Sequence, residues 1–330
     1  MVDENRSDLR HAWLHRVLTE AFDVRPLAGD ASFRRYFRVR QGERSYVLMD
    51  APPPHEDVRP FLHVREWLEQ AGLRVSQLYA ADIEQGLLLL EDFGDLTWAV
   101  HLGSGGDAAP MLADALRQLH RLQASAPTVT LAPFDLARMR RECDLYLDWY
   151  LPCVAGFTPD EGQREAFHAG LHQALLQIEA LPRVPVHLDY HSRNLMLPAG
   201  GLPLGQIDYQ DAVAGPVTYD LASLLYDCYQ DYPEEMRRQW SREFFTALPD
   251  DLAAAFSDFE QWHRLLRLTA LQRHIKAIGI FARLAHRDGK RQFLDEIPLT
   301  RRHLFDELAF LGWAEADCPL LFCRPAAVSV

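Results

Sequence analysis

The chain has 330 residues, 48% of them hydrophobic and 25% charged, a composition typical of a folded globular protein large enough for two lobes. Its 34 Lys and Arg against 47 Asp and Glu give a formal net charge of −13, so we expect neither a nucleic acid nor a membrane as partner. Five cysteines without a Cys-x-x-Cys pair, a charged N-terminus and the lack of a long apolar run favour the cytoplasm.

The first third of the sequence predicts a helix followed by a small β-sheet. Apolar residues recur with helical spacing over 7–22, and β-branched and aromatic residues flank a turn at 41–44. A helix is expected over 58–73, ended by Gly72, and paired strands over 78–83 and 86–90. Gly29, Ala31 and Ser32 are small enough for backbone N–H groups to approach a phosphate, although an ordinary hairpin turn also fits.

Beyond the glycine-rich break at 103–106 the chain is predicted to be mainly helical. Helical segments are expected at 111–124, 135–150, 161–181, 234–247 and 252–286. Asp135 is the expected N-cap of the second of these. A short hairpin interrupts them, with β-type runs at 194–197 and 202–207 around a Pro-Ala-Gly-Gly turn.

The most informative stretch surrounds this hairpin. His187, Asp189, His191 and Asn194 fall within eight positions, and Asp208 follows the second β-type run. In phosphoryl transfer a protein orients a hydroxyl and holds Mg²⁺ against the phosphates, which a carboxylate, an amide oxygen and a second carboxylate can do. Asp189, Asn194 and Asp208 fit these three roles.

The motifs His187-x-Asp189-x-x-x-x-Asn194, Ile207-Asp208 and Gly215-Pro216-x-x-Tyr219-Asp220 together resemble the aminoglycoside phosphotransferase and choline kinase group, small-molecule relatives of protein kinases. The resemblance implies an α+β, protein-kinase-like fold with two lobes. Residues 1–93 would form a β-rich, nucleotide-binding amino lobe, and 94–330 a larger, mainly α-helical carboxy lobe with the catalytic loop and acceptor pocket.

The same resemblance implies ATP and Mg²⁺ as cofactors and assigns roles to individual residues. Asp189 would be the catalytic base, Asn194 and Asp208 the Mg²⁺ ligands, and His187 and Asp220 structural supports of the catalytic loop. Asp220 heads an apolar helix, so stabilisation of the helix dipole remains an alternative role for it.

The nucleotide contacts are expected in the amino lobe. Ser32, Phe33, Arg34 and Arg35 would cover the ATP phosphates, and the backbone of Glu91 and Phe93 would contact the adenine. One position departs from the family pattern, because Met49 stands where a phosphate-binding lysine is usual. Either an arginine such as Arg34, Arg35 or Arg44 replaces this charge, or the nucleotide binds weakly.

The acceptor is suggested by three further segments, 29–38, 49–53 and 275–284, which are similar to the bacterial amino-sugar kinases of cell-wall recycling. That branch phosphorylates N-acetylmuramate and N-acetylglucosamine at the anomeric hydroxyl. His191, Arg273 and Lys276 are the residues expected to contact the sugar, although a solvated basic face would explain either cation.

Three alternatives stay open at this stage. A kinase of the same fold could act on a cationic acceptor, such as an aminoglycoside or choline, and the missing lysine allows a non-catalytic binding protein. The His-x-Asp pair with a second His is also a ligand set of non-haem iron oxygenases. Those enzymes are built from many short strands, which disagrees with the helical pattern here.

Overall fold

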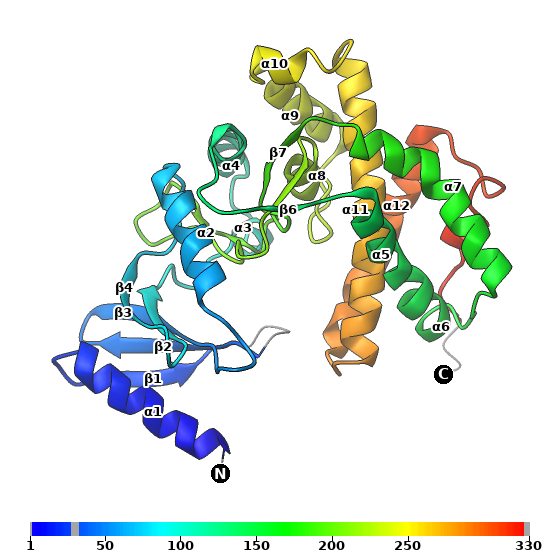
Figure 1. The fold of residues 1–330 in the computed structure, drawn as a ribbon. Helices are drawn as coiled ribbons and strands as arrows, with labels where there is room; N and C mark the ends of the chain where they lie inside the picture. The colour runs from blue at the N-terminus through cyan, green and yellow to red at the C-terminus, as the bar shows by residue number, and fades with distance from the viewer. Residues whose placement is uncertain (1, 28–32, 327–330) are drawn as a thin grey trace. The chain divides into compact units, whose positions relative to one another are not determined.

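The computed structural model describes residues 2–27 and 33–326, and the chain folds into two compact units (Figure 1). The first unit comprises Met1–Leu96 and Met196–Gln210, and the second comprises Thr97–Leu195 and Asp211–Val330. Within the described ranges, the structure contains no helix that is both long and apolar enough to cross a bilayer.

The first unit is built on a five-stranded antiparallel sheet in the order β1-β2-β3-β5-β4. Its strands are β1 (Asp23–Pro26), β2 (Arg35–Gln41), β3 (Arg44–Asp50), β4 (Leu78–Asp82) and β5 (Leu87–Glu91), with α2 (Arg59–Gln70) between β3 and β4. The five strands and α2 confirm the helix and strands predicted for this part of the chain. Gly72 follows α2 with φ +75°, a backbone conformation that glycine adopts without strain.

The opening helix α1 (Val2–Val17) packs on this sheet through Trp13 and Leu14, which share a buried core with Val39 and Leu48. It ends at Val17, earlier than the predicted residue 22. The chain must turn there to begin β1.

The α1 helix is also held to the end of β3 by charge. The carboxylate of Asp50, which is fully buried, accepts hydrogen bonds from Arg6 at 2.7 Å and from Arg10 at 2.8 Å. Removing both arginines would leave a buried carboxylate without its counterions, which is strongly unfavourable.

The hairpin of β8 (Leu195–Met196) and β9 (Gly205–Gln206) groups with the first unit from Met196 onward. The Gln206 N–H donates to the Arg74 carbonyl at 2.7 Å, and the Leu197 N–H to the Leu96 carbonyl at 2.7 Å. The expected division at residue 93 does not include this hairpin, because its backbone partners lie far away in the sequence.

The second unit is mainly helical, with a three-stranded sheet in the order β6-β10-β7 formed by Ala132–Pro133, Val213–Pro216 and Arg183–Val186. Its first helices are α3 (Trp98–Gly103), α4 (Ala109–Ala124), α5 (Leu136–Leu145), α6 (Leu151–Cys153) and α7 (Glu161–Glu179). They are followed by α8 (Tyr219–Leu225), α9 (Glu234–Thr246), α10 (Asp250–Ala253), α11 (Phe259–His286) and α12 (Ile297–Leu311).

The longest helix, α11, lies at the centre of this unit and contacts α5, α7, α8, α9 and α12 (Figure 1). The predicted helix over 252–286 is wrong in its first part. The chain breaks after α10, and Asp258 caps α11 by accepting the Gln261 N–H at 2.8 Å. The Asp135 N-cap is confirmed, since its side chain accepts the Arg138 N–H at 2.8 Å. We made no helix prediction for α3 or α12.

The predicted helix over 135–150 changes character where α11 crosses it. After α5 the backbone forms a π-helical turn over Tyr146–Tyr150. Gly279 of α11 lies directly against it, because a Cβ added there would stand 2.4 Å from the Leu145 carbonyl carbon. Only a glycine permits this approach of two backbones.

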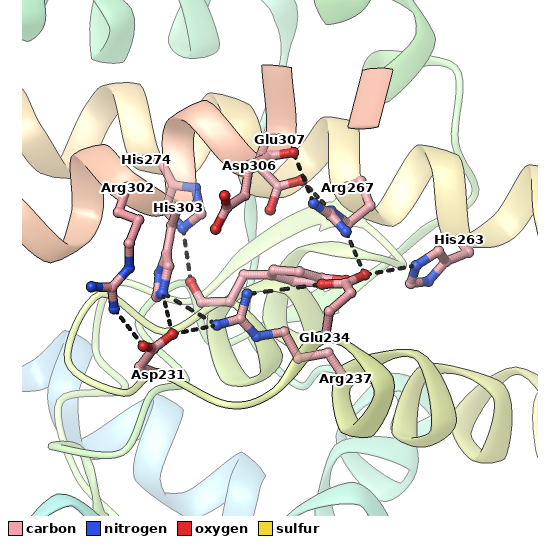
Figure 2. Close-up of polar contacts among 11 residues, drawn as sticks. Asp231, Glu234, Arg237, His263, Arg267, His274, Arg302, His303, Asp306 and Glu307 are labelled. Carbon is pink, nitrogen blue, oxygen red and sulfur yellow. Dashed lines mark hydrogen bonds and ion pairs between the residues drawn. The ribbon is translucent and has the colours of Figure 1, made fainter. Parts of the chain in front are cut away.

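A network of polar side chains joins the segment after α8 to α9, α11 and α12 (Figure 2). Arg237 lies 3.3 Å from Asp231 and 3.2 Å from His303, and Arg302 pairs with the same aspartate. Beside them, Arg267 bonds to Glu234 at 2.5 Å and to the fully buried Glu307. These contacts fix the segment that leads away from the catalytic loop.

Candidate active site

The loop between β7 and β8 is held in place by one carboxylate of α8. Asp220, fully buried, accepts the backbone N–H of His187 at 2.6 Å and that of Leu188 at 3.0 Å. Leu188 has φ +84°, a left-handed conformation that is unfavourable for a branched side chain. The two hydrogen bonds therefore stabilise a strained turn immediately before Asp189.

Asn194 is positioned by the same loop. Its side-chain N–H donates to the Asp189 carbonyl at 3.0 Å, and its backbone N–H donates to the His191 carbonyl at 2.9 Å. Because the amide nitrogen is bonded inward, the side-chain oxygen is left to accept another group. A neutral oxygen donor of this kind suits Mg²⁺.

A second carboxylate, which the sequence analysis missed, fastens the far side of the loop. Asp227 accepts the Ser192 N–H at 2.9 Å and the Tyr229 N–H at 2.9 Å. The Tyr190 hydroxyl donates to the Ala115 carbonyl at 2.9 Å, which ties the loop to α4. The position of Asp227, seven residues after Asp220 and beyond the end of α8, is the one signal that could have indicated it.

The carboxylate of Asp189 is half-buried, and two opposing effects act on its pKa. Burial raises it, but the nearby charges of Lys276 and Arg273, joined by His191 once its ring is protonated in acid, outweigh burial and hold the pKa below its ordinary value. Asp189 is therefore ionised at neutral pH, so its side chain can only accept hydrogen bonds.

Burial has the opposite result at Asp220. It raises the pKa of this carboxyl to about 7, although the two backbone N–H groups of His187 and Leu188 favour the charged form. His187 itself is buried, and its ring lies edge-on to the Tyr190 ring at 5.7 Å.

The two cations on α11 that the sequence analysis singled out lie together. Lys276 Nζ is 3.4 Å from the Tyr219 hydroxyl and 3.6 Å from Glu142 Oε1 of α5. The guanidinium carbon of Arg273 is 5.5 Å from the centre of the Tyr219 ring. Since Tyr219 precedes Asp220, α8 brings both cations and the catalytic loop into one cluster.

His191 faces a different neighbour. Burial is the main cause that lowers its pKa, so its imidazole is neutral at pH 7. Its ring meets Tyr229 edge-on at 5.2 Å, and Arg193 covers the same tyrosine with its guanidinium carbon 3.6 Å from the ring centre. Arg193 also pairs with Glu296. This aromatic contact was not predicted.

Asp208 belongs to the first unit, where it follows β9. Its backbone has φ +64°, and its Oδ1 accepts a hydrogen bond from Gln210 Nε2 at 2.8 Å. Asp208 and Leu188 are the two non-glycine residues with positive φ in the described ranges. Backbone strain of this kind is concentrated at functional positions.

The segment expected to cover the phosphates is described from Phe33 onward, and Ser32 lies outside the described residues. The Phe33 side chain is exposed and stacks on His55, while its backbone N–H donates to Glu56 Oε1 at 3.2 Å. Arg34 Nε lies 3.9 Å from Glu56 Oε2, and Arg35 is exposed in β2. Glu56 was missed because nothing in the local sequence links it to residues 33 and 34.

Met49, in the position where the family pattern places lysine, is buried in the core of the sheet. It cannot contribute a charge, so a cation must come from elsewhere. Glu66 of α2 is on the surface, where it accepts a hydrogen bond from Gln70.

Glu91 and Phe93, the two residues expected at the adenine, are held by different contacts. The Glu91 N–H already donates to the Gln77 carbonyl at 2.8 Å, and its side chain pairs with Arg74 at 2.5 Å. Phe93 packs its ring against Gly205, where an added Cβ would stand 2.4 Å from the ring. This contact holds the segment that follows β5 against β9.

Comparison with known proteins places this chain among phosphotransferases. Residues 23–256 match the phosphotransferase enzyme family. A curated protein of Pseudomonas aeruginosa, named N-acetylmuramate/N-acetylglucosamine kinase, is 39% identical over 345 residues, which covers 97% of this chain and 98% of that protein.

Solved structures with low sequence identity share the fold. Choline kinase LicA from Streptococcus pneumoniae aligns with a TM-score of 0.60 at 14% identity, over 92% of this chain and 99% of its own. Aminoglycoside phosphotransferase APH(4)-Ia aligns with a TM-score of 0.58 at 16% identity, over 92% of this chain and 98% of its own. These alignments confirm the predicted α+β, protein-kinase-like fold.

Proposed function

Because this chain belongs to the phosphotransferase enzyme family, we propose that it transfers the γ-phosphoryl group of ATP to the anomeric hydroxyl of N-acetylmuramate and N-acetylglucosamine. The observation that carries the proposal is the ionised Asp189 on a loop braced by Asp220. It occurs in a chain that is similar over nearly its whole length to a protein named N-acetylmuramate/N-acetylglucosamine kinase. The product would be a sugar 1-phosphate, formed in the recycling of peptidoglycan.

Asp189 would act on the acceptor hydroxyl. Its carboxylate, ionised and fixed by the loop, would accept a hydrogen bond from that hydroxyl and orient the oxygen towards the phosphorus. A carboxylate with a lowered pKa is a weak base, so the proton would pass to Asp189 late, as the new O–P bond forms. Positioning would then supply much of the rate enhancement.

Mg²⁺ is the expected second cofactor, and the donor chemistry of the chain fits it. Asn194 offers an amide oxygen, because its nitrogen is bonded to the Asp189 carbonyl, and Asp208 offers a carboxylate. Both are hard oxygen ligands, which Mg²⁺ prefers. Bound Mg²⁺ would neutralise charge on the phosphates. Among the described side chains, no group of three or more His, Cys, Asp or Glu is arranged to hold a metal.

The nucleotide would be held by the first unit. We propose Arg34, oriented by Glu56, as the cation that replaces the family lysine, with Ser32, Phe33 and Arg35 beside it over the phosphates. The adenine would meet the backbone after β5. Phe93 is the better donor there, since the Glu91 N–H is engaged within the sheet.

The acceptor would lie against α11 and the catalytic loop. His191, Arg273 and Lys276 are the residues that we propose contact it, since all three lie near the Asp189 carboxylate and influence its pKa. His187 and Asp220 would support the loop without touching the sugar. We further propose that the reaction takes place in the cytoplasm, where thiols stay reduced.

The test measures Mg²⁺-dependent ADP release from ATP with N-acetylmuramate, N-acetylglucosamine, glucose, choline and kanamycin as acceptors. We expect turnover with the two N-acetyl sugars and its loss by a factor of about 10² to 10⁴ in Asp189→Asn, which preserves volume but removes the base. Asp251→Asn, on the surface of α10, is the matched control. ³¹P NMR of the product would identify the phosphorylated hydroxyl.

Other outcomes separate the alternatives. Turnover with choline or kanamycin alone would retain the fold and reject the sugar acceptor. ATP binding without turnover of any acceptor would favour a non-catalytic nucleotide-binding protein.

A further inference from the structure

Arg237, Arg273 and Arg301 are buried arginines of the second unit with side-chain nitrogens that lack a partner in the described ranges, and Arg273 has two such nitrogens where the others have one. The Arg273 side chain is only 7% exposed, and its Nε and Nη1 atoms have no hydrogen-bond partner within the described ranges. Buried polar groups in folded proteins nearly always have a partner, and an unpaired buried charge is strongly unfavourable. Such a group suggests that its partner is a ligand.

The neighbouring cation is in a different situation. Lys276 lies one turn further along α11, on the same face, and its ammonium is already near Glu142 and the Tyr219 hydroxyl. Glu142 in turn accepts hydrogen bonds from Arg138 at 3.2 Å and from Gln272 at 3.1 Å. Lys276 therefore has a counterion within the protein, whereas Arg273 lacks a hydrogen-bonded one.

Arg273 is also close to the proposed reaction centre. It lies over the Tyr219 ring and contributes to the lowered pKa of the Asp189 carboxylate. An anion that binds Arg273 would then lie in the same electrostatic environment as the hydroxyl that Asp189 orients.

The two proposed acceptors differ in one group, a carboxylate, which is the kind of group that would pair with Arg273. N-acetylmuramate carries a lactyl ether with a free carboxylate on C3, and N-acetylglucosamine has a hydroxyl there. C3 is separated from the anomeric carbon by a single ring carbon, so an anomeric hydroxyl at Asp189 would bring the carboxylate into the neighbourhood of Arg273. Guanidinium and carboxylate match in charge and in their paired hydrogen-bonding geometry.

We propose that Arg273 binds the carboxylate of the acceptor sugar and thereby selects N-acetylmuramate over N-acetylglucosamine. This inference rests on the proposed function. Lys276 contributes less to binding this carboxylate. Its charge adds to the positive field near Arg273, but it is already paired with Glu142 in the protein.

The test has two parts: the carboxylate of the ligand is removed first, and Arg273 is then replaced in the protein. Calorimetry gives the Kd of the wild-type chain for N-acetylmuramate and for its primary amide, which has nearly the same shape and no charge. We expect the amide to bind about tenfold more weakly or worse, as for a lost charge-assisted hydrogen bond. Equal Kd values would overturn the inference, and this comparison needs neither turnover nor a variant.

Kinetics then assigns the effect to Arg273. In Arg273→Gln the ratio of kcat/KM for N-acetylmuramate to that for N-acetylglucosamine should fall about tenfold or more, mainly through the KM of N-acetylmuramate. Arg273→Lys, which keeps the charge, should recover part of the ratio. Arg264→Gln, an exposed arginine on the same helix, is the control and should leave the ratio unchanged.

An equal loss with both sugars would overturn the inference, because Arg273 would then act on the phosphoryl group or on the position of Asp189. The proposed function fails in a different way, namely when the wild-type chain phosphorylates neither sugar. Thermal unfolding of each variant verifies that the fold is retained.

Discussion

The Asp220 carboxylate accepts the backbone N–H of Leu188 at 3.0 Å and thereby holds a left-handed residue directly before Asp189. The second oxygen of Asp220 accepts the N–H of His187 at 2.6 Å. Both acceptors of one side chain are thus used to fix one turn. The geometry of the proposed base depends on α8 as much as on the loop itself.

Asp220→Asn tests this dependence. The substitution keeps the volume but turns one acceptor into a donor that faces a backbone N–H, so we expect a loss of about 1–3 kcal/mol in the free energy of unfolding. Turnover should fall more than ATP affinity, because the loop carries Asp189. Urea unfolding and ADP release measure the two effects. Asp251→Asn should change neither, and an Asp220→Asn protein with full activity would contradict the bracing role.

Lys276→Met tests the electrostatic control of Asp189. Lys276 is the nearby charge that contributes most to lowering the Asp189 pKa, so its removal should raise that pKa. The acidic limb of the kcat/KM profile, where the base becomes protonated, should then move to higher pH. Lys276→Arg keeps the charge and should leave the limb near its wild-type position. A profile that is identical in all three proteins would show that Lys276 does not act on Asp189.

Arg34→Gln tests the substitute for the missing lysine. If Arg34 binds the phosphates, its loss should raise the KM for ATP about tenfold, the equivalent of one strong ionic contact. Glu56→Gln should have a smaller effect in the same direction, because it removes the charge that orients Arg34 but leaves Arg34 in place. Arg59→Gln, exposed at the start of α2, serves as the control. An unchanged KM in Arg34→Gln would assign the charge to another arginine.

The sequence predicts most of the fold and the central part of the site, because these depend on residues close together in the chain. Asp189 and Asn194 are five positions apart, and their mutual hydrogen bond lies within one loop. The sheet of the first unit follows from alternating apolar residues and local turns.

The rest depends on contacts between distant segments. Glu56 meets Phe33, Asp227 meets Ser192 and Glu142 meets Lys276 only after folding, so no local pattern identifies these contacts. The π-helical turn at Tyr146–Tyr150 is equally invisible in its own sequence, because it occurs where α11 crosses the end of α5. The incomplete pairing of Arg273 likewise becomes apparent only when its neighbours are known.

Gly279→Ala tests that crossing. Alanine normally stabilises a helix interior relative to glycine, but here its Cβ would stand 2.4 Å from a backbone carbon of Leu145. We expect a net loss of about 1–3 kcal/mol, typical of overpacking, measured by urea unfolding. Gly162→Ala in α7 is the matched control, since its nearest contact is an ordinary 3.5 Å. A more stable Gly279→Ala protein would mean that the two backbones can separate.

Glu307, a fully buried member of the network of Figure 2, couples that network to pH. Burial raises the pKa of its carboxyl to about 8, despite the pairing with Arg267. In the unfolded chain a glutamate titrates near 4.3, so between these values only the folded state holds the proton. The stability contributed by Glu307 is therefore complete below about pH 4 and is lost as the pH rises through 8.

Glu307→Gln removes this titration. Between pH 7 and 8.5 the free energy of unfolding of the wild-type chain should fall by about 1 kcal/mol more than that of the variant, since each bound proton contributes about 1.4 kcal/mol per pH unit. Contributions from other groups, such as Asp220, cancel in the difference. Glu235→Gln, exposed on α9, should keep the wild-type slope. Parallel slopes for wild type and Glu307→Gln would mean that Glu307 is already ionised at pH 7, with Arg267 as its full counterion.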